Sequence, residues 1–194
     1  MKIAVLALQG AFAEHRRMLH SLSAETIEIR NADDWQQHKD ALIIPGGEST
    51  VMTKLLRQLN LEQPIRQAIL QGMPVFGTCA GLILLARQED GKPTQRLATM
   101  NIDVCRNAYG RQLGSFHTQA ACNGIDHPVP MTFIRAPYIR RTYETAQPLA
   151  TVDGHIVAAR QYNQLVTAFH PELDNDTALH RYFLEMVRTS TWEQ

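Results

Sequence analysis

The sequence predicts an α/β protein in which helices cover both faces of a sheet, and two features support this prediction. Short apolar segments alternate with segments of helical spacing through the first half of the chain, as they do in proteins built around a parallel sheet. The apolar segments are also continuous, at residues 3–8, 41–44 and 74–76. Such runs are typical of strands that are buried on both faces.

The remaining elements follow from spacing and turn residues. A further strand is expected at residues 26–29, and helices are expected at 11–22, 48–58, 61–70, 82–86 and 176–188. Beyond Met100 the pattern changes to short strands near 102–105, 131–134, 149–152, 155–160 and 165–169. The polar segment 88–95, with Gly91 and Pro93, is expected to be a surface loop. No repeat or linker interrupts the chain, so a single domain over 1–194 is expected.

Composition narrows the possible functions. Lys plus Arg and Asp plus Glu both number 19, so the formal net charge is zero. This balance argues against a nucleic-acid binder that works through bulk positive charge. No apolar run approaches the roughly 20 residues that a membrane-spanning helix needs, and the start of the chain is expected to be a buried strand and not a signal peptide.

The cysteines indicate a reducing compartment. Cys79, Cys105 and Cys122 are odd in number and irregular in spacing, which does not suit a disulfide framework. No His or Cys cluster has metal-ligand spacing, so no metal site is expected. We therefore expect a cytoplasmic protein.

The first chemical motif is Gly77-Thr-Cys79-Ala-Gly81, which lies between a predicted strand and a predicted helix. It is the cysteine version of the G-x-S-x-G nucleophile elbow. The sharp turn places the thiol at a helix N-terminus, where partial positive charge favours the thiolate. The N–H group of Ala80 would then point to where an oxyanion forms. The alternative is that Cys79 is a small buried apolar residue.

The second motif supplies a base. An apolar strand ends at His170-Pro171-Glu172, and a residue before proline favours extended geometry. Residues i and i+2 of an extended chain face the same side, so Glu172 could orient the imidazole of His170 to accept a thiol proton. The alternative is a surface loop with an ordinary His and Glu.

The third motif, Pro45-Gly46-Gly47-Glu48-Ser49-Thr50, follows another buried strand. Its glycines would let the backbone approach a ligand, and one of its N–H groups could be a second oxyanion donor. The alternative is a tight turn in which Ser49 or Thr50 caps the next helix. The other histidines tested, at positions 15, 20, 38, 155 and 180, are expected to be solvated, and Cys105 and Cys122 to be inert.

Together these segments resemble the class I, triad-type glutamine amidotransferases, and within them the glutaminase subunits of pyridoxal 5′-phosphate synthase. The resemblance extends along nearly the whole chain in the family's order. It rests on residues 6–10, 45–50, 76–82, 106–107 with 110–112, 133–137 and 169–173. The segments 46–50 and 133–137 separate this family from other glutaminases.

The resemblance implies a three-layer α/β sandwich with a mostly parallel, mixed sheet. It implies hydrolysis of L-glutamine by Cys79, His170 and Glu172, without a cofactor. Ammonia would pass to a separate, barrel-shaped synthase subunit that makes pyridoxal 5′-phosphate. By position, the glutamine-binding residues would be Gly47, Glu48, Ser49, Arg106, Ile134 and Arg135, and the oxyanion donors would be Gly47 and Ala80.

The sequence departs from the family at His117, where an acidic residue is usual, and this leaves local contacts open. Three other functions remain possible. The chain could be a triad glutaminase with another ammonia acceptor, a non-catalytic subunit that keeps the fold, or a thiol peptidase. The synthase that raises activity would identify the ammonia acceptor. The intact triad argues against a non-catalytic subunit. Cleavage of protein substrates, without cleavage of glutamine, would indicate a peptidase.

Overall fold

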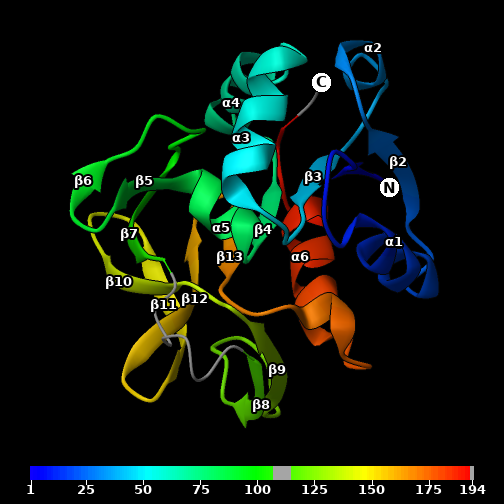
Figure 1. Ribbon diagram of the computed structural model, residues 1–194. Helices are drawn as coiled ribbons and strands as arrows, with labels where there is room; N and C mark the ends of the chain where they lie inside the picture. Colours follow the sequence, from blue (N-terminus) through cyan, green and yellow to red (C-terminus); the bar gives the residue numbers. More distant parts are fainter. Residues whose placement is uncertain (107–114, 193–194) are drawn as a thin grey trace.

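The computed structural model describes residues 1–106 and 115–192 of the chain. Among these residues, eleven strands form one large sheet, and two more form a separate hairpin. Helices flank the large sheet (Figure 1).

One half of the large sheet is entirely parallel. Its strand order is β2-β1-β3-β4-β13. The strands are β1 (Lys2–Leu6), β2 (Glu25–Ile29), β3 (Ala41–Ile44), β4 (Val75–Thr78) and β13 (Gln164–Thr167). Because parallel strands end at the same edge, the loops after β1, β3, β4 and β13 meet there. This is the edge at which open α/β sheets bind ligands.

The other half of the sheet is mainly antiparallel and continues the order as β13-β12-β10-β7-β5-β6, with β11 paired to β12. The β5–β7 pair is parallel, and the other pairs of this half are antiparallel. The strands are β5 (Ala86–Glu89), β6 (Lys92–Pro93), β7 (Met100–Cys105), β10 (Tyr138–Thr142), β11 (Gln147–Val152) and β12 (His155–Gln161). The predicted mixed sheet is confirmed.

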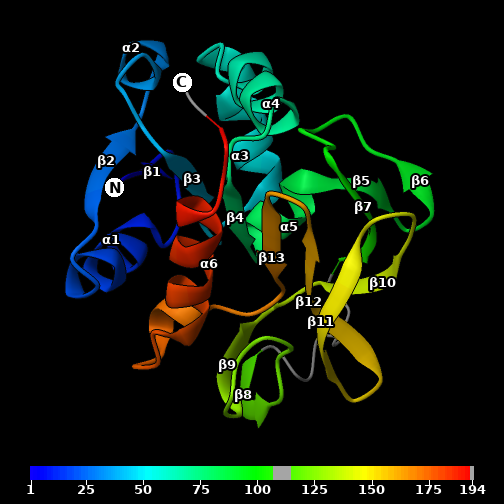
Figure 2. The same cartoon turned by 180° about the vertical axis from the view of Figure 1, so that it is seen from behind.

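Helices form the two outer layers. On one face lie α1 (Phe12–Ser21) and α6 (Ala178–Arg188), since His15 and His180 both pack against the Phe76 ring of β4. On the other face, α3 (Ser49–Gln58) packs against α4 (Glu62–Leu70) and α5 (Ala80–Leu85). The two opposite views show α3 and α6 on different sides of the parallel strands (Figures 1 and 2). The short helix α2 spans Ala32–Trp35.

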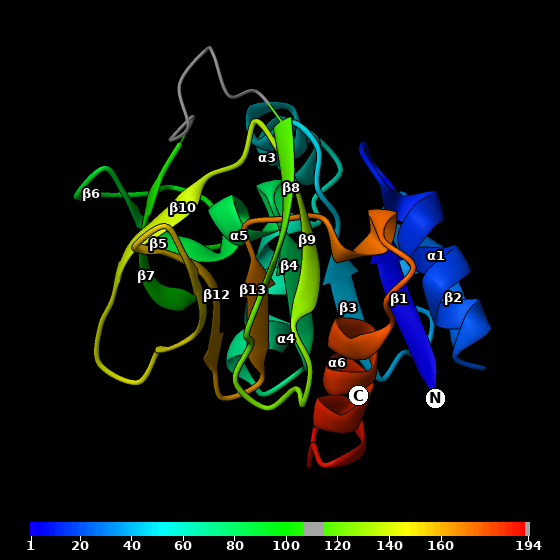
Figure 3. The same ribbon diagram turned by 90° about the horizontal axis from the view of Figure 1, so that it is seen from below.

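The separate hairpin consists of β8 (Ser115–Ala120) and β9 (Val129–Ile134), and Figure 3 shows it beside the end of β13. Its Phe116 and Phe133 rings stack with centroids 4.4 Å apart, and Phe133 also meets Phe169. The N–H of His170 donates to the carbonyl of Thr132 at 2.8 Å. The hairpin therefore supports the segment that carries the predicted base.

Several predictions of secondary structure need correction. Segment 88–95 is not a plain loop, because β5 and β6 form a hairpin around Gly91, whose φ is +77°. Strands β8 and β10 were not predicted, and the side chains of β8 are half-buried or exposed, so its sequence lacks a clear apolar alternation. Within the described residues, no helix is long and apolar enough to cross a membrane.

Candidate active site

Cys79 occupies a strained turn between β4 and α5. Its φ of 47° and ψ of −96° lie outside the regions that non-glycine residues usually adopt. Two glycines allow this turn to pack closely. A Cβ on Gly81 would lie 2.1 Å from the carbonyl oxygen of Ile44, and one on Gly77 would lie 2.8 Å from the Gly81 carbonyl carbon. The glycines of the predicted elbow are thus required by tight packing.

His170 and Glu172 meet directly after β13. The Nδ1 atom of His170 lies 2.7 Å from Oε1 of Glu172, and both side chains are almost fully buried. The local backbone differs from the extended one expected, because Pro171–Leu173 forms the 3₁₀ helix η1. The predicted contact therefore forms through a helical turn, which carries the carboxylate back toward the imidazole.

The charges of this group are strongly coupled. Burial by itself lowers the pKa of His170, but hydrogen bonds with the Cys79 thiol and with Glu172 raise it to about 10. Burial likewise raises the pKa of Glu172, but the neighbouring His15 and the hydrogen bond with His170 hold it below its ordinary value. An ionised carboxylate behind a protonated imidazole is the state that favours a thiolate at Cys79.

The loop after β3 lies against both the base and the loop after β1. A Cβ on Gly46 would come within 2.2 Å of Cε1 of His170, and one on Gly47 within 2.3 Å of Oε1 of Gln9. The carbonyl of Gly46 accepts a hydrogen bond from Ala11 N–H at 3.1 Å. The paired glycines therefore permit a close approach to the imidazole.

Glu48 has two structural roles in this loop. Its N–H donates to Oε1 of Gln9 at 2.6 Å, and its carboxylate caps α3 by accepting from the N–H groups of Thr50 and Val51. The cap is thus Glu48, and not Ser49 or Thr50 as the alternative interpretation of this motif held. Gln9 was missed as a site residue, although a polar residue directly after a buried strand at this edge is a usable signal.

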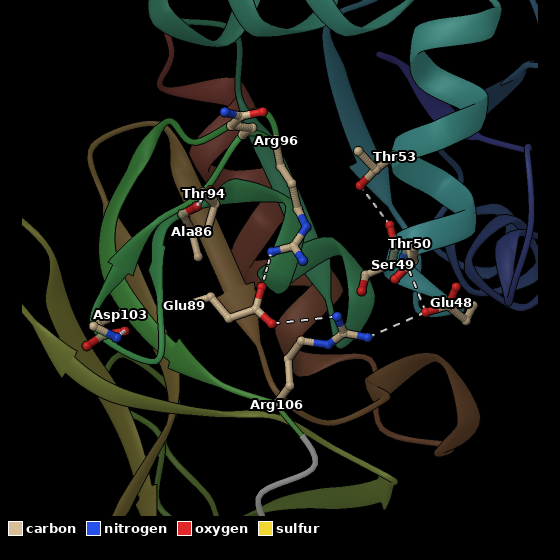
Figure 4. Close-up of polar contacts among 12 residues, drawn as sticks. Glu48, Ser49, Thr50, Thr53, Ala86, Glu89, Thr94, Arg96, Asp103 and Arg106 are labelled. Carbon is tan, nitrogen blue, oxygen red and sulfur yellow. Dashed lines mark hydrogen bonds and ion pairs between the residues drawn. The ribbon is translucent and has the colours of Figure 1, made fainter.

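Arg106, directly after β7, links two carboxylates near the site (Figure 4). Its guanidinium lies 3.6 Å from Glu48 and 3.5 Å from Glu89, and Glu89 is also paired with Arg96. The pairs of Arg106 are partly exposed, so they contribute little to stability. They do fix the direction in which the guanidinium points.

A cleft of about 360 Å³ opens beside these groups. Its lining includes Cys79, His170 and all six residues predicted to contact substrate: Gly47, Glu48, Ser49, Arg106, Ile134 and Arg135. Gln9, Ile83 and Pro137 also line it and were not predicted. Ala80 and Glu172 are buried and stand behind the lining.

A second, larger cleft of about 730 Å³ lies between α3 and the β5–β6 hairpin. Its lining contains neither the thiol nor the imidazole, and the side chains there are mostly polar or charged. The smaller cleft is therefore the candidate active site, because it joins a nucleophile to a base.

The expectation that His15 and His180 are solvated is wrong, since both side chains are fully buried. His15 lies behind Glu172, with its Nε2 atom 3.4 Å from Oε2 of the carboxylate. The sequence pattern did not reveal that these two histidines are buried, because each one faces the sheet from a different helix. Cys122 agrees with its predicted inertness, as burial raises the pKa of its thiol to about 11.

His117, the position at which the sequence departs from the family, lies on β8 outside the cleft lining, 3.8 Å from a carboxylate oxygen of Asp174. Positions 107 and 110–112 of the resemblance fall outside the described residues. Within the described part of the chain, no group of three or more His, Cys, Asp or Glu side chains could hold a metal ion.

Comparison with known proteins gives consistent matches along the chain. A sequence model described as the SNO glutamine amidotransferase family matches residues 5–189. Pyridoxal 5′-phosphate synthase subunit PdxT of Streptococcus pneumoniae strain CGSP14 is 58% identical, over 97% of this chain and 98% of that protein. The same subunit of strain ATCC 700669 is 56% identical over the same shares of both chains.

Solved structures agree with these matches. A crystal structure of a glutamine amidotransferase superposes with a TM-score of 0.90 at 42% identity, covering 96% of this chain and 99% of the other. A Thermoplasma acidophilum structure, described as "a putative gmp synthase subunit a protein", superposes with a TM-score of 0.70 over 97% of this chain and 94% of the other. Its identity is only 16%, so it shows the fold alone.

Proposed function

Because this chain belongs to the SNO glutamine amidotransferase family, we propose that it hydrolyses L-glutamine to L-glutamate and ammonia. Cys79 is the nucleophile, His170 is the base and Glu172 orients the base. The observation that supports this most strongly is the strained turn at Cys79, which meets the buried His170–Glu172 pair at one cleft. Neither half of this arrangement would provide an activated thiol alone.

The reaction is an acyl transfer in two steps. His170 takes the thiol proton, and the Cys79 sulfur attacks the side-chain amide carbon of glutamine. When the tetrahedral adduct collapses, the carbon–nitrogen bond breaks and His170 gives its proton to the departing amide nitrogen, which leaves as ammonia. Water then attacks the γ-glutamyl thioester, His170 accepts a proton from that water, and glutamate leaves as the thiol re-forms.

The oxyanion donors in this proposal are the N–H groups of Ala80 and Gly47. Ala80 begins α5 directly after the nucleophile, so its N–H has no partner one turn back within the helix. Gly47 lies in the loop that approaches His170. Its neighbour Gly46 is so close to the imidazole that a Cβ on Gly46 would overlap the ring. Both donors come from backbone groups, which keep their direction during the reaction.

The substrate's head group fits the charges at the mouth of the cleft. Free glutamine carries one carboxylate and one ammonium group on its α-carbon. Arg106 and Arg135 supply positive charge, and Glu48 supplies negative charge, along the lining. Ser49 adds a hydroxyl group, and Ile134 an apolar surface for the substrate's methylene groups.

We also propose that the ammonia passes to a separate synthase subunit of barrel shape, which makes pyridoxal 5′-phosphate. The support is that the curated relatives are named as subunits of pyridoxal 5′-phosphate synthase and align over 98% of their length. A reactive thiolate at Cys79 must stay reduced, so we infer that the complex works in the cytoplasm.

The test is ammonia release from L-glutamine by the purified chain, alone and with the synthase subunit, with Cys79→Ala as the control. Activity that rises with the synthase present and disappears in Cys79→Ala supports both the chemistry and the assembly. Activity that ignores the synthase keeps the glutaminase and refutes the partner. The absence of ammonia under both conditions refutes the glutaminase.

A further inference from the structure

A buried group of polar side chains lies behind the triad, on the face of the sheet away from the cleft. His15 of α1 and His180 of α6 are both fully buried, and Nδ1 of His15 lies 2.9 Å from Nε2 of His180. On its other side, Nε2 of His15 faces Oγ1 of Thr78 at 3.2 Å and Oε2 of Glu172 at 3.4 Å. The contacts of the triad thus continue from Glu172 to His15 and from His15 to His180.

The direction of the hydrogen bonds in this group follows from its charges. Burial lowers the pKa of His15, and it lowers that of His180 to about 3, so both rings are neutral and each carries one N–H. An ionised carboxylate can only accept hydrogen bonds. The proton of His15 therefore belongs on Nε2, toward Glu172, and its Nδ1 accepts from Nε2–H of His180.

The opposite tautomer fits poorly. A lone pair on Nε2 of His15 would face a carboxylate oxygen, which repels it. His180 would then carry its proton on Nδ1, an atom that has no hydrogen-bond partner among the described residues. Burying an N–H donor without a partner costs about 1–3 kcal/mol.

The carboxylate itself needs a second contact. Oε1 of Glu172 is occupied by His170. Among the described residues, no donor reaches Oε2 with full hydrogen-bond geometry. The Nε2–H of His15, which also contacts Oγ1 of Thr78 at 3.2 Å, lies 3.4 Å from Oε2 and is therefore the group that faces the buried charge. Without it this oxygen would have no facing N–H group in a buried site, where the charged form is disfavoured.

We propose that His15 is a positioning residue for catalysis: its Nε2–H holds one oxygen of Glu172, so that the other oxygen holds His170 beside Cys79. This inference rests on the triad assignment made above and concerns a residue outside the cleft lining. Besides this pair, the titratable groups that face Glu172 or His15 are His170, His180 and Glu14. Of the groups that act on Glu172, His15 contributes most to keeping its carboxylate ionised.

Two substitutions at position 15 differ in the group that they keep. The amide of His15→Gln extends about as far as Nε2, so this variant keeps a donor toward Glu172. The amide of His15→Asn is one methylene shorter and keeps a polar group only near Nδ1, toward His180. Leu19→Ala is the control for damage to the packing of α1, since Leu19 is fully buried on the same helix.

The readout is the rate at which iodoacetamide alkylates Cys79, measured against pH by mass spectrometry of the peptide that contains it. This rate follows the thiolate and needs no glutamine, so its outcome is independent of the proposed substrate. We expect His15→Asn to raise, by about one pH unit, the pH below which the alkylation rate falls. At a fixed acid pH this is about a tenfold loss of rate. His15→Gln should restore most of the rate, and Leu19→Ala should keep the wild-type profile.

A second measurement uses the unaltered chain. The side-chain ¹⁵N shifts of His15 distinguish its two neutral tautomers, and we expect the proton on Nε2. A proton on Nδ1 would overturn the proposal, even if no variant at position 15 folded. So would a His15→Asn profile equal to that of the wild type, or an equal shift in His15→Gln and His15→Asn.

Discussion

Adding one methyl group at Gly46 should disable the site while leaving the fold in place. The backbone of Gly46 is not in the left-handed region, so alanine can adopt its conformation without strain. Its Cβ, however, would lie 2.2 Å from Cε1 of His170, where ordinary contact begins at 3.4 Å. The ring would have to recede by about 1.2 Å, the difference between these distances.

A displacement of this size has a large effect on rate and a modest one on stability. Misplacing a catalytic group by about 1 Å can cost about a hundredfold in rate, because the imidazole would leave the 2.7 Å contact with Glu172 that orients it. Overpacking a buried site costs about 1–3 kcal/mol in the free energy of unfolding. We therefore expect Gly46→Ala to fold and to lose at least about 99% of its kcat.

The assay is ammonia release at saturating glutamine, with unfolding by urea measured on the same samples. Gly154→Ala is the control, because nothing lies within 4 Å of a Cβ there and only its left-handed backbone (φ +79°) opposes alanine. This control should lose about 1–2 kcal/mol of stability and none of its kcat. A Gly46→Ala protein with wild-type kcat would refute the close approach of this loop to the imidazole.

Three further predictions concern the same edge of the sheet. Gln9→Ala removes the acceptor that anchors the Glu48 N–H. The KM for glutamine should therefore rise about fivefold, and an unchanged KM would show that the loop holds its position without Gln9. Arg106→Gln should raise the KM for glutamine about tenfold, which steady-state kinetics measures. Its free energy of unfolding, measured with urea, should change by less than about 0.5 kcal/mol, since the pair with Glu48 is partly exposed. His170 has a folded pKa of about 10, above its ordinary 6.5, so its contribution to stability is full below pH 6.5 and is lost as pH rises toward 10. Urea unfolding across this range should show the decline, and Cys79→Ala, which lacks the thiol partner, should show a smaller one.

Local patterns in the sequence were sufficient for the main elements of the fold. Buried parallel strands are recognisable because both of their faces are apolar, as residues 3–6 and 41–44 show. The elbow around Cys79 is likewise local, since a strand, a tight turn and a helix follow one another within a dozen residues. His170 and Glu172 are two residues apart, so their contact could be predicted even though the backbone between them is a 3₁₀ turn.

The contacts made by weakly patterned segments could not be predicted in this way. Strand β8 has half-buried or exposed side chains, and its partner β9 lies some ten residues further along the chain. The role of Gln9 depends on the loop after β3, 39 residues away in sequence. Neither contact leaves a periodic signal, because each joins segments that the sheet alone brings together.

Residues close together in the chain were enough to establish the type of fold, the order of the chemical motifs and the resemblance to glutamine amidotransferases. The surroundings of Glu172 became visible only in three dimensions. Its two oxygens face histidines from different elements, His170 after β13 and His15 of α1. Such a contact arises from packing α1 against the sheet, and a helical histidine has the same local pattern whether it faces solvent or a buried carboxylate.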